Sequence, residues 1–115
     1  MKLQVAIDLL STADALALLN KVAEHVDVIE LGTPLIKQQG LSVVTNVKAA
    51  YPDKLVFADM KTMDAGELEA DLAFNAGADI MTVLGSAGDS TIAGAVKFYK
   101  KESQQEILPS RLNSC

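Results

Sequence analysis

The sequence lacks the features that mark several large classes of protein. Its single cysteine, Cys115, excludes a disulfide within the chain. No apolar run approaches the roughly 20 residues of a membrane-spanning helix, and the first residues carry no signal-peptide pattern. Basic residues are scarce as well, because 10 Lys and Arg stand against 15 Asp and Glu and give a net charge of −5. These absences predict a cytoplasmic location and argue against nucleic acid or an anionic membrane as a partner.

The length and composition are those of one globular domain. Half of the 115 residues are hydrophobic and 22% are charged, as in ordinary globular proteins. The chain is long enough to form a hydrophobic core, but it is well short of the roughly 250 residues of a complete (β/α)₈ barrel.

Strand-like and helix-like segments alternate along the chain at a steady spacing. Strands are predicted over residues 3–8, 27–31, 55–59 and 79–84, and helices over 12–25, 33–50, 64–77 and 90–100. The strands are nearly continuous apolar runs, as in parallel strands that are covered on both faces. We therefore expect an α/β fold with a parallel sheet of four βα units within residues 1–97.

The most informative motif is LVFADMKTMD, residues 55–64. It places Asp59, Lys61 and Asp64 in the pattern D-x-K-x-x-D at the end of a predicted strand. Because side chains alternate between the faces of a strand, Asp59 and Lys61 are expected to point the same way, at the edge where α/β proteins keep their catalytic groups. Asp64 has a structural explanation, because it is placed to cap the next helix with Glu67 three residues later.

Two further carboxylates are predicted at the same edge of the sheet. Asp8 and Glu30 end the first two strands, so they would gather in one cleft with Asp59 if the three strands pair in order. Glu30 is the most telling, because an isolated carboxylate inside an apolar strand is costly unless it is paired or bound to metal. Two or three carboxylates suit a hard divalent cation such as Mg²⁺. Lys61 could offset the remaining negative charge or move protons.

These residues carry a resemblance to a known family. Residues 1–97 resemble the N-terminal half of 3-hexulose-6-phosphate synthase, in the orotidine-phosphate-decarboxylase-like group of TIM (β/α)₈ barrels. The stretches that carry the resemblance are MKLQVAIDLL, VDVIELGTPLIKQQG, FADMKTMDAGE and GADIMTVLGSAGDSTIAGA. The D-x-K-x-x-D pattern marks the whole group, whereas ELGTP and DMKTMDAGE resemble the branch of the synthases and the keto-gulonate-phosphate decarboxylases. The full DMKTMD wording resembles the synthases more. The fold that this implies is the first half of a TIM barrel.

The resemblance also implies a reaction and a set of site residues. The reaction is a reversible aldol condensation of formaldehyde with D-ribulose 5-phosphate, through an enediolate that Mg²⁺ stabilises. Glu30 and Asp59 would lie at the metal, Asp8 would support Lys61, and all four would contact the substrate. Lys61 would handle protons or the enediolate oxygen. Relatives are homodimers in which the residue matching Asp64 reaches into the neighbouring subunit's site, so Asp8, Lys61 and Asp64 are the expected catalytic residues.

The C-terminal residues depart from this pattern. Residues 98–115 are expected to form an unmatched polar tail with no strand longer than 106–108, as if a barrel sequence had been cut or continued out of frame. Relatives carry a histidine, an arginine and phosphate-binding loops in their second half, whereas the single arginine here is Arg111. The chain alone is therefore expected to be weakly active or inactive. Open edges at the first and fourth strands and an uncovered inner face favour self-association.

Three alternatives remain open on the sequence. The first is a sibling enzyme, a keto-gulonate- or orotidine-phosphate decarboxylase, of which the latter needs no metal. The second is a phospho-receiver domain with Asp59 as the acceptor, although such domains carry an acid pair where this chain has Asp8, Leu9 and Leu10. The third is a non-catalytic fragment.

Overall fold

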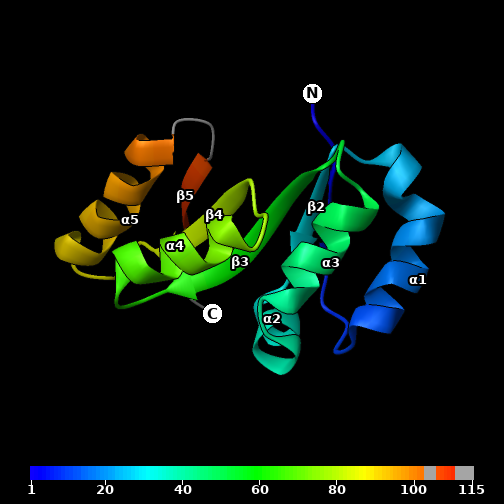
Figure 1. Ribbon diagram of the computed structural model, residues 1–115, viewed down its shortest axis with the longest axis horizontal. Helices are drawn as coiled ribbons and strands as arrows, with labels where there is room; N and C mark the ends of the chain where they lie inside the picture. The colour runs from blue at the N-terminus through cyan, green and yellow to red at the C-terminus, as the bar shows by residue number, and fades with distance from the viewer. Residues whose placement is uncertain (103–105, 111–115) are drawn as a thin grey trace.

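The computed structural model describes residues 1–102 and 106–110, with side chains described through residue 97. Its helices and strands alternate along the chain (Figure 1). In order they are β1 (Gln4–Ile7), α1 (Thr12–Val22), the 3₁₀ turn η1 (Ala23–His25), β2 (Val28–Leu31), α2 (Thr33–Gln39), α3 (Ser42–Ala50), β3 (Leu55–Thr62), α4 (Gly66–Asn75), β4 (Ile80–Leu84), α5 (Asp89–Glu102) and β5 (Glu106–Ser110). None of the helices in the described ranges is long and apolar enough to cross a membrane.

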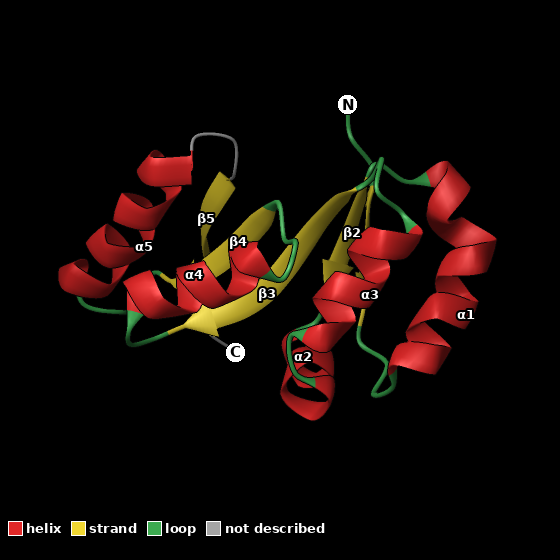
Figure 2. Ribbon diagram, viewed as in Figure 1, coloured by secondary structure: helices red, strands yellow, loops and turns green. Residues whose placement is uncertain are grey.

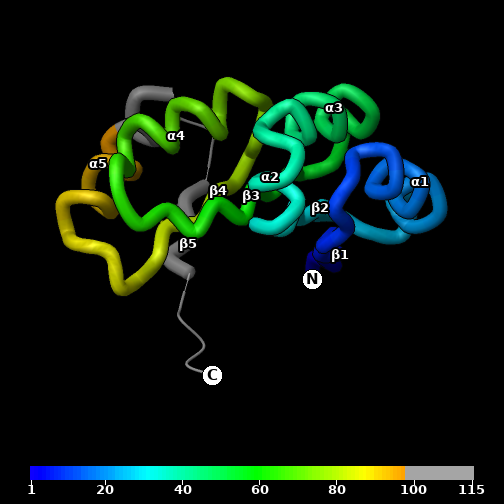
Figure 3. The backbone as a smooth tube through the Cα atoms, turned by 90° about the horizontal axis from the view of Figure 1, so that it is seen from below, coloured from blue at the N-terminus to red at the C-terminus, as the bar shows by residue number. Residues whose placement is uncertain are grey.

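The strands form one parallel sheet in the order β1-β2-β3-β4-β5. The predicted α/β fold with four βα units is therefore confirmed. The first three strands pair in sequence order, which is the condition for Asp8, Glu30 and Asp59 to share one edge. The helices lie along one side of the curved sheet (Figures 2 and 3). Because all of its strands are parallel, their carboxyl ends share one edge. This edge is where Asp8, Glu30 and Asp59 were predicted.

The main hydrophobic core fills the space between the sheet and its helices. Side chains from alternate strand positions are fully buried there, among them Ile29, Leu31, Val56 and Met81. The opposite, concave face of the sheet carries only a small buried cluster, which consists of Val28, Phe57 and Ile80 with Leu55 against it. The sheet is thus covered by helices on one face, and its concave face has no comparable core among the described residues.

Two predicted helix boundaries are wrong. The single helix predicted over residues 33–50 is two helices, because Gly40 adopts φ 70 and ends α2 before α3 begins at Ser42. A residue with positive φ cannot continue a right-handed helix, and glycine adopts that conformation at little cost. The helix predicted from Asp64 begins at Gly66 instead, because Ala65 has φ 49 and serves as the N-cap without a side-chain hydrogen bond. The predicted capping box of Asp64 and Glu67 is therefore wrong.

The C-terminal part of the sheet also differs from the prediction. Glu106–Ser110 forms a fifth strand that pairs parallel with β4 along its whole length, so β4 is no edge and the described sheet ends at β1 and β5. Proline is excluded from central strands because it lacks an N–H, but Pro109 lies in an edge strand of the described sheet, where this is tolerated. The predicted tail, residues 98–115, also includes 103–105 and 111–115, which lie outside the described residues.

Candidate functional site

The centre of the candidate site is an ion pair between Asp59 and Lys61 at the end of β3. Lys61 Nζ donates to Asp59 Oδ2 and lies 3.1 Å from Thr33 Oγ1. The Lys61 side chain keeps 48% of its surface exposed, whereas the Asp59 side chain keeps 11%. The predicted meeting of these two residues is confirmed. A ligand can reach the ammonium, while the carboxylate behind it is largely closed off from water.

Two threonines that sequence reasoning missed complete this pair. Thr82 Oγ1, on β4, donates to Asp59 Oδ1 over 2.8 Å and accepts from the Lys61 amide over 2.9 Å. Thr33 Oγ1, at the start of α2, donates to the Asp59 carbonyl over 2.6 Å. Thr82 could have been suspected because it is a polar residue inside the apolar strand 79–84. Thr33 is the first residue of the helix predicted over 33–50, and in the structure it is the first residue of α2 after the N-cap Gly32.

The backbone at this pair departs from a regular strand. Lys61 has φ 48, a left-handed conformation that is uncommon for a residue with a side chain. The register between β3 and β4 also shifts within this stretch, which marks a bulge. Thr62, directly after Lys61, donates to Glu69 Oε2 on α4 and so ties the end of the strand to the helix. The ion pair therefore rests on an irregular but well-anchored backbone.

Asp8 and Glu30 lie on the first two strands at the same edge of the sheet. Glu30 is half-buried, and its Oε2 accepts a 2.6 Å hydrogen bond from Gln4 Nε2 on β1. Asp8 is exposed and packs against Gly32, where an added Cβ would lie 2.0 Å from Asp8 Oδ1. Within the described residues, Lys61 Nζ bonds Asp59 and Thr33 and not Asp8. The support that Asp8 was predicted to give Lys61 stays a prediction.

The predicted metal site has a limited set of donors. The described part of the chain contains no group of three or more His, Cys, Asp or Glu side chains placed to hold a metal ion. Asp8, Glu30 and Asp59 thus do not form a three-carboxylate site. A smaller set can still serve Mg²⁺, which is commonly bound through one or two carboxylates while water or substrate oxygens complete its coordination. Glu30 and Asp59 are carboxylates of this kind.

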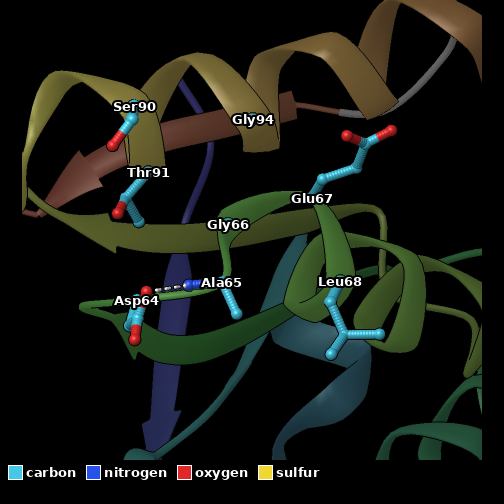
Figure 4. Close-up of a pocket in the computed structure, with 8 residues that line it drawn as sticks. All are labelled: Asp64, Ala65, Gly66, Glu67, Leu68, Ser90, Thr91 and Gly94. Carbon is cyan, nitrogen blue, oxygen red and sulfur yellow. Dashed lines mark hydrogen bonds between the residues drawn. The ribbon is translucent and has the colours of Figure 1, made fainter.

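Asp64 lies apart from the ion pair. Its side chain is exposed, and its Oδ1 accepts from the Ala65 amide over 2.7 Å (Figure 4). It lines an open groove of about 300 Å³ between the N-terminal halves of α4 and α5, together with Glu67, Leu68, Ser90 and other residues of these helices. Asp8, Glu30, Asp59 and Lys61 do not line this groove. Among the described residues, the side-chain hydrogen bonds of Asp59 and Lys61 are made to each other and to Thr33 and Thr82, and not to Asp64.

Comparisons with known proteins identify the family. The model of the orotidine 5'-phosphate decarboxylase / HUMPS family matches residues 1–114. The chain belongs to this family. The match runs past residue 97, where the resemblance visible in the sequence ends.

Named relatives of this family place the chain more closely. It is 79% identical over 108 residues to the 3-hexulose-6-phosphate synthase of Mycobacterium gastri, and this match covers 94% of this chain and 52% of that protein. A crystal structure of a 3-hexulose-6-phosphate synthase superposes with a TM-score of 0.90 at 72% identity, over 93% of this chain and 52% of that chain. The 3-keto-L-gulonate-6-phosphate decarboxylase of Vibrio cholerae O1 biovar El Tor superposes with a TM-score of 0.89 at 34% identity, over 97% of this chain and 54% of that chain.

The chain thus spans about half the length of the relatives that it matches in this family. These structural neighbours are TIM barrels, and the sheet corresponds to the N-terminal half of such a barrel, as predicted. In this orotidine 5'-phosphate decarboxylase / HUMPS chain, the pair of Asp59 and Lys61 lies at the carboxyl ends of the strands, which is the edge that carries the active site in TIM barrels.

Proposed function

We propose that this chain carries the acid–base half of a 3-hexulose-6-phosphate synthase, an aldehyde-lyase that joins formaldehyde to D-ribulose 5-phosphate. The observation that carries the proposal is the Lys61 ammonium, which is half exposed yet held by Asp59 and Thr33 at the carboxyl edge of the sheet. The 79% identity to a relative with this name supports the choice of substrates.

The proposed reaction moves two protons and makes one carbon–carbon bond. C1 of ribulose 5-phosphate, which lies beside the ketone, loses a proton and becomes the carbon of an enediolate. That carbon attacks the carbon of formaldehyde, and the formaldehyde oxygen gains a proton. Lys61 Nζ is the group proposed to move both protons: as the neutral amine it would take the proton from C1, and as the resulting ammonium it would face the enediolate and then give a proton to the formaldehyde oxygen. A preorganised cation stabilises such developing negative charge better than water does.

Glu30 and Asp59 are the residues proposed to hold Mg²⁺. When bound, Mg²⁺ would supply charge stabilisation to the ketone and hydroxyl oxygens of the substrate. Asp59 already uses Oδ1 and Oδ2 for Thr82 and Lys61, but each carboxylate oxygen has a second lone pair to offer. Gln4 orients Glu30 from the neighbouring strand. Asp8 is proposed to bind the substrate at the same edge.

A second part of the proposal is self-association, with a homodimer as the expected form. Asp64 would then act in the site of the neighbouring copy, since it is exposed and its hydrogen bond within the described residues is to the Ala65 amide and not to the ion pair. Three apolar side chains of the same segment are also exposed, because Met63, Leu68 and Leu72 keep 55%, 60% and 47% of their surface. Exposed apolar surface favours contact with another protein surface.

The 115-residue chain by itself is proposed to convert formaldehyde and ribulose 5-phosphate only slowly. Their described side chains supply the ammonium and the carboxylates, but the phosphate of the substrate would need cationic or backbone donors of its own, commonly found after strands 7 and 8 of a TIM barrel. Without that remote binding energy, the substrate is poorly held against Lys61.

The test of this function is carbon–carbon bond formation from ¹³C-formaldehyde and ribulose 5-phosphate, followed by NMR. Two proteins are compared: this chain alone, and this chain joined to the remaining half of the Mycobacterium gastri relative. We expect Mg²⁺-dependent product from the joined protein, loss of product with EDTA, and little product from the chain alone. A folded joined protein that forms no product would contradict the proposed function, and full activity of the chain alone would contradict its proposed weakness.

A second candidate is the sibling decarboxylase activity. It is favoured by the close superposition with the Vibrio cholerae decarboxylase, at a TM-score of 0.89. The identity of 34% to that protein is less than half of the 79% to the synthase, which makes the synthase the first choice. Release of CO₂ from 3-keto-L-gulonate 6-phosphate at a higher rate than formaldehyde uptake would reverse this order. Decarboxylation of orotidine 5'-phosphate that survives chelation would point to the metal-free branch.

A further inference from the structure

The bulge of β3 brings a single residue of β4 against both ends of the ion-pair segment. The two strands pair at Ala58–Met81 and again at Thr62–Val83. Between these pairs, the stretch of β3 from Asp59 to Lys61 lies opposite Thr82 alone. The regular ladder of backbone hydrogen bonds cannot continue through such a mismatch. Something else must hold this part of β3 to β4.

The Thr82 hydroxyl makes that connection. It accepts from the Lys61 amide over 2.9 Å and donates to Asp59 Oδ1 over 2.8 Å. An amide can only donate, so the one hydroxyl proton of Thr82 is directed at the carboxylate, and the hydroxyl uses its donor and one acceptor position at once. Thr82 itself is buried, with 4% of its surface exposed.

The Thr82 bonds also stabilise an uncommon backbone conformation. Lys61 has φ 48, which persists only where the surroundings fix it. Its amide is fixed by Thr82, while its ammonium reaches back to Asp59 and Thr33. If the amide were released, Lys61 could relax toward an extended conformation and its side chain would leave Asp59. A β-branched threonine suits the task, because its χ1 rotation is restricted.

We infer that Thr82 is a positioning residue, whose hydroxyl locks both ends of the β3 bulge and thereby sets Lys61 beside Asp59. This inference rests on the proposed function for its consequence in catalysis, but not for its structural part. Thr82 acts through Asp59 and Lys61 and is not itself placed on the substrate.

The structural part is tested by hydrogen exchange of the Lys61 amide, measured by NMR on the full chain. In the unsubstituted chain this amide should exchange at least about tenfold more slowly than an unstructured one, because it is bonded inside the protein. Thr82→Val keeps the shape and removes the hydroxyl, and it should speed exchange about tenfold or more. Thr82→Ser keeps the hydroxyl and should remain within about threefold of the original.

The chain offers two matched controls for this measurement. The Val56 amide, also on β3, donates to the Asp79 side chain over 2.8 Å, and its exchange should not change in Thr82→Val. Thr45→Val removes a hydroxyl that donates to the Ala76 carbonyl on the helix side of the molecule, and it should leave the Lys61 amide unchanged.

The catalytic consequence is tested in the joined protein described above. Thr82→Val should lower kcat by about 10- to 100-fold with KM within about threefold, since a small misplacement of a catalytic group has effects of this order. Thr82→Ser should restore most of kcat. A folded Thr82→Val protein with unchanged kcat would overturn the inference.

Hydrogen exchange of the Lys61 amide tests the inference even where the kinetic measurement gives no result. An unprotected Lys61 amide in the original chain overturns the inference even if Thr82→Val does not fold. So does a Thr82→Ser variant that exchanges as fast as Thr82→Val. If the unsubstituted joined protein forms no product, the proposed function fails, while the Lys61 amide still decides the role of Thr82.

Discussion

The two sides of the carboxyl edge differ in how firmly their charged groups are held. On the β3–β4 side, Asp59 is buried and bonded on both oxygens, to Lys61 and Thr82. On the β1–β2 side, Asp8 is exposed, and Glu30 is half-buried and accepts a hydrogen bond from Gln4. The first side is preorganised before any ligand arrives. The second side keeps carboxylate surface exposed, and a metal ion or a substrate needs such exposed surface in order to bind.

The largest effect is expected from breaking the preorganised side. Lys61→Met removes the ammonium and should lower kcat of the joined protein by about 10³-fold, within the range for loss of a general acid–base group. Steady-state kinetics of ¹³C-product formation measure it. Lys37→Met, which removes an exposed lysine of α2, is the control and should keep full activity. A Lys61→Met protein within tenfold of the original would contradict the proposed role of Lys61.

A smaller effect is expected from a substitution that crowds the β1–β2 side of the carboxyl edge. Gly32→Ala would bring a Cβ to 2.0 Å from Asp8 Oδ1 and 2.9 Å from the Ile7 carbonyl. The side chain can move but the backbone carbonyl cannot move easily, so we expect a loss of about 1–3 kcal/mol in the free energy of unfolding. Urea denaturation measures this loss.

Two further variants sharpen this prediction. Gly88→Ala is the matched control, because the nearest atom to its Cβ is 3.8 Å away, and it should change stability little. Asp8→Ala combined with Gly32→Ala should recover part of the loss. If Gly32→Ala were as stable as the original, the close approach of Asp8 to Gly32 would be wrong.

The smallest effect is expected from neutralising the half-buried carboxylate. Glu30→Gln should weaken Mg²⁺ binding at least about tenfold, since even changes outside the first ligand shell have effects of this size. Stability should change little. Titration of activity with Mg²⁺ measures it, and Glu24→Gln, which alters an exposed carboxylate paired with His25, is the control. Equal Mg²⁺ dependence in both variants would remove Glu30 from the proposed metal site.

The sequence predicted the meeting of Asp59 and Lys61, but for an incomplete reason. Regular alternation along a strand was the argument, whereas Lys61 has φ 48 within a bulge. A bulge shifts the register without a signature in the apolar pattern, so the place of Thr82 opposite it could not be foreseen. The alternation also could not show that Asp8 would lie against Gly32 and bond neither Asp59 nor Lys61 within the described residues.

The fold was more predictable than its boundaries. The apolar runs located β1 to β4, and the helix predicted from residue 12 begins there, with Ser11 as its N-cap through the Asp14 amide. The breaks at Gly40 and Ala65 depend on single backbone conformations that packing selects. The fifth strand was missed because Pro109 lies within it, and only an edge position makes that proline acceptable.

The central claim is that Lys61, held by Asp59, moves the proton at C1 of ribulose 5-phosphate. Solvent deuterium exchange tests it without formaldehyde: the joined protein is incubated with ribulose 5-phosphate and Mg²⁺ in D₂O, and NMR follows the C1 protons. We predict that deuterium enters C1 and that Lys61→Met abolishes the exchange, while Lys37→Met does not. Exchange at the same rate in Lys61→Met would contradict the account.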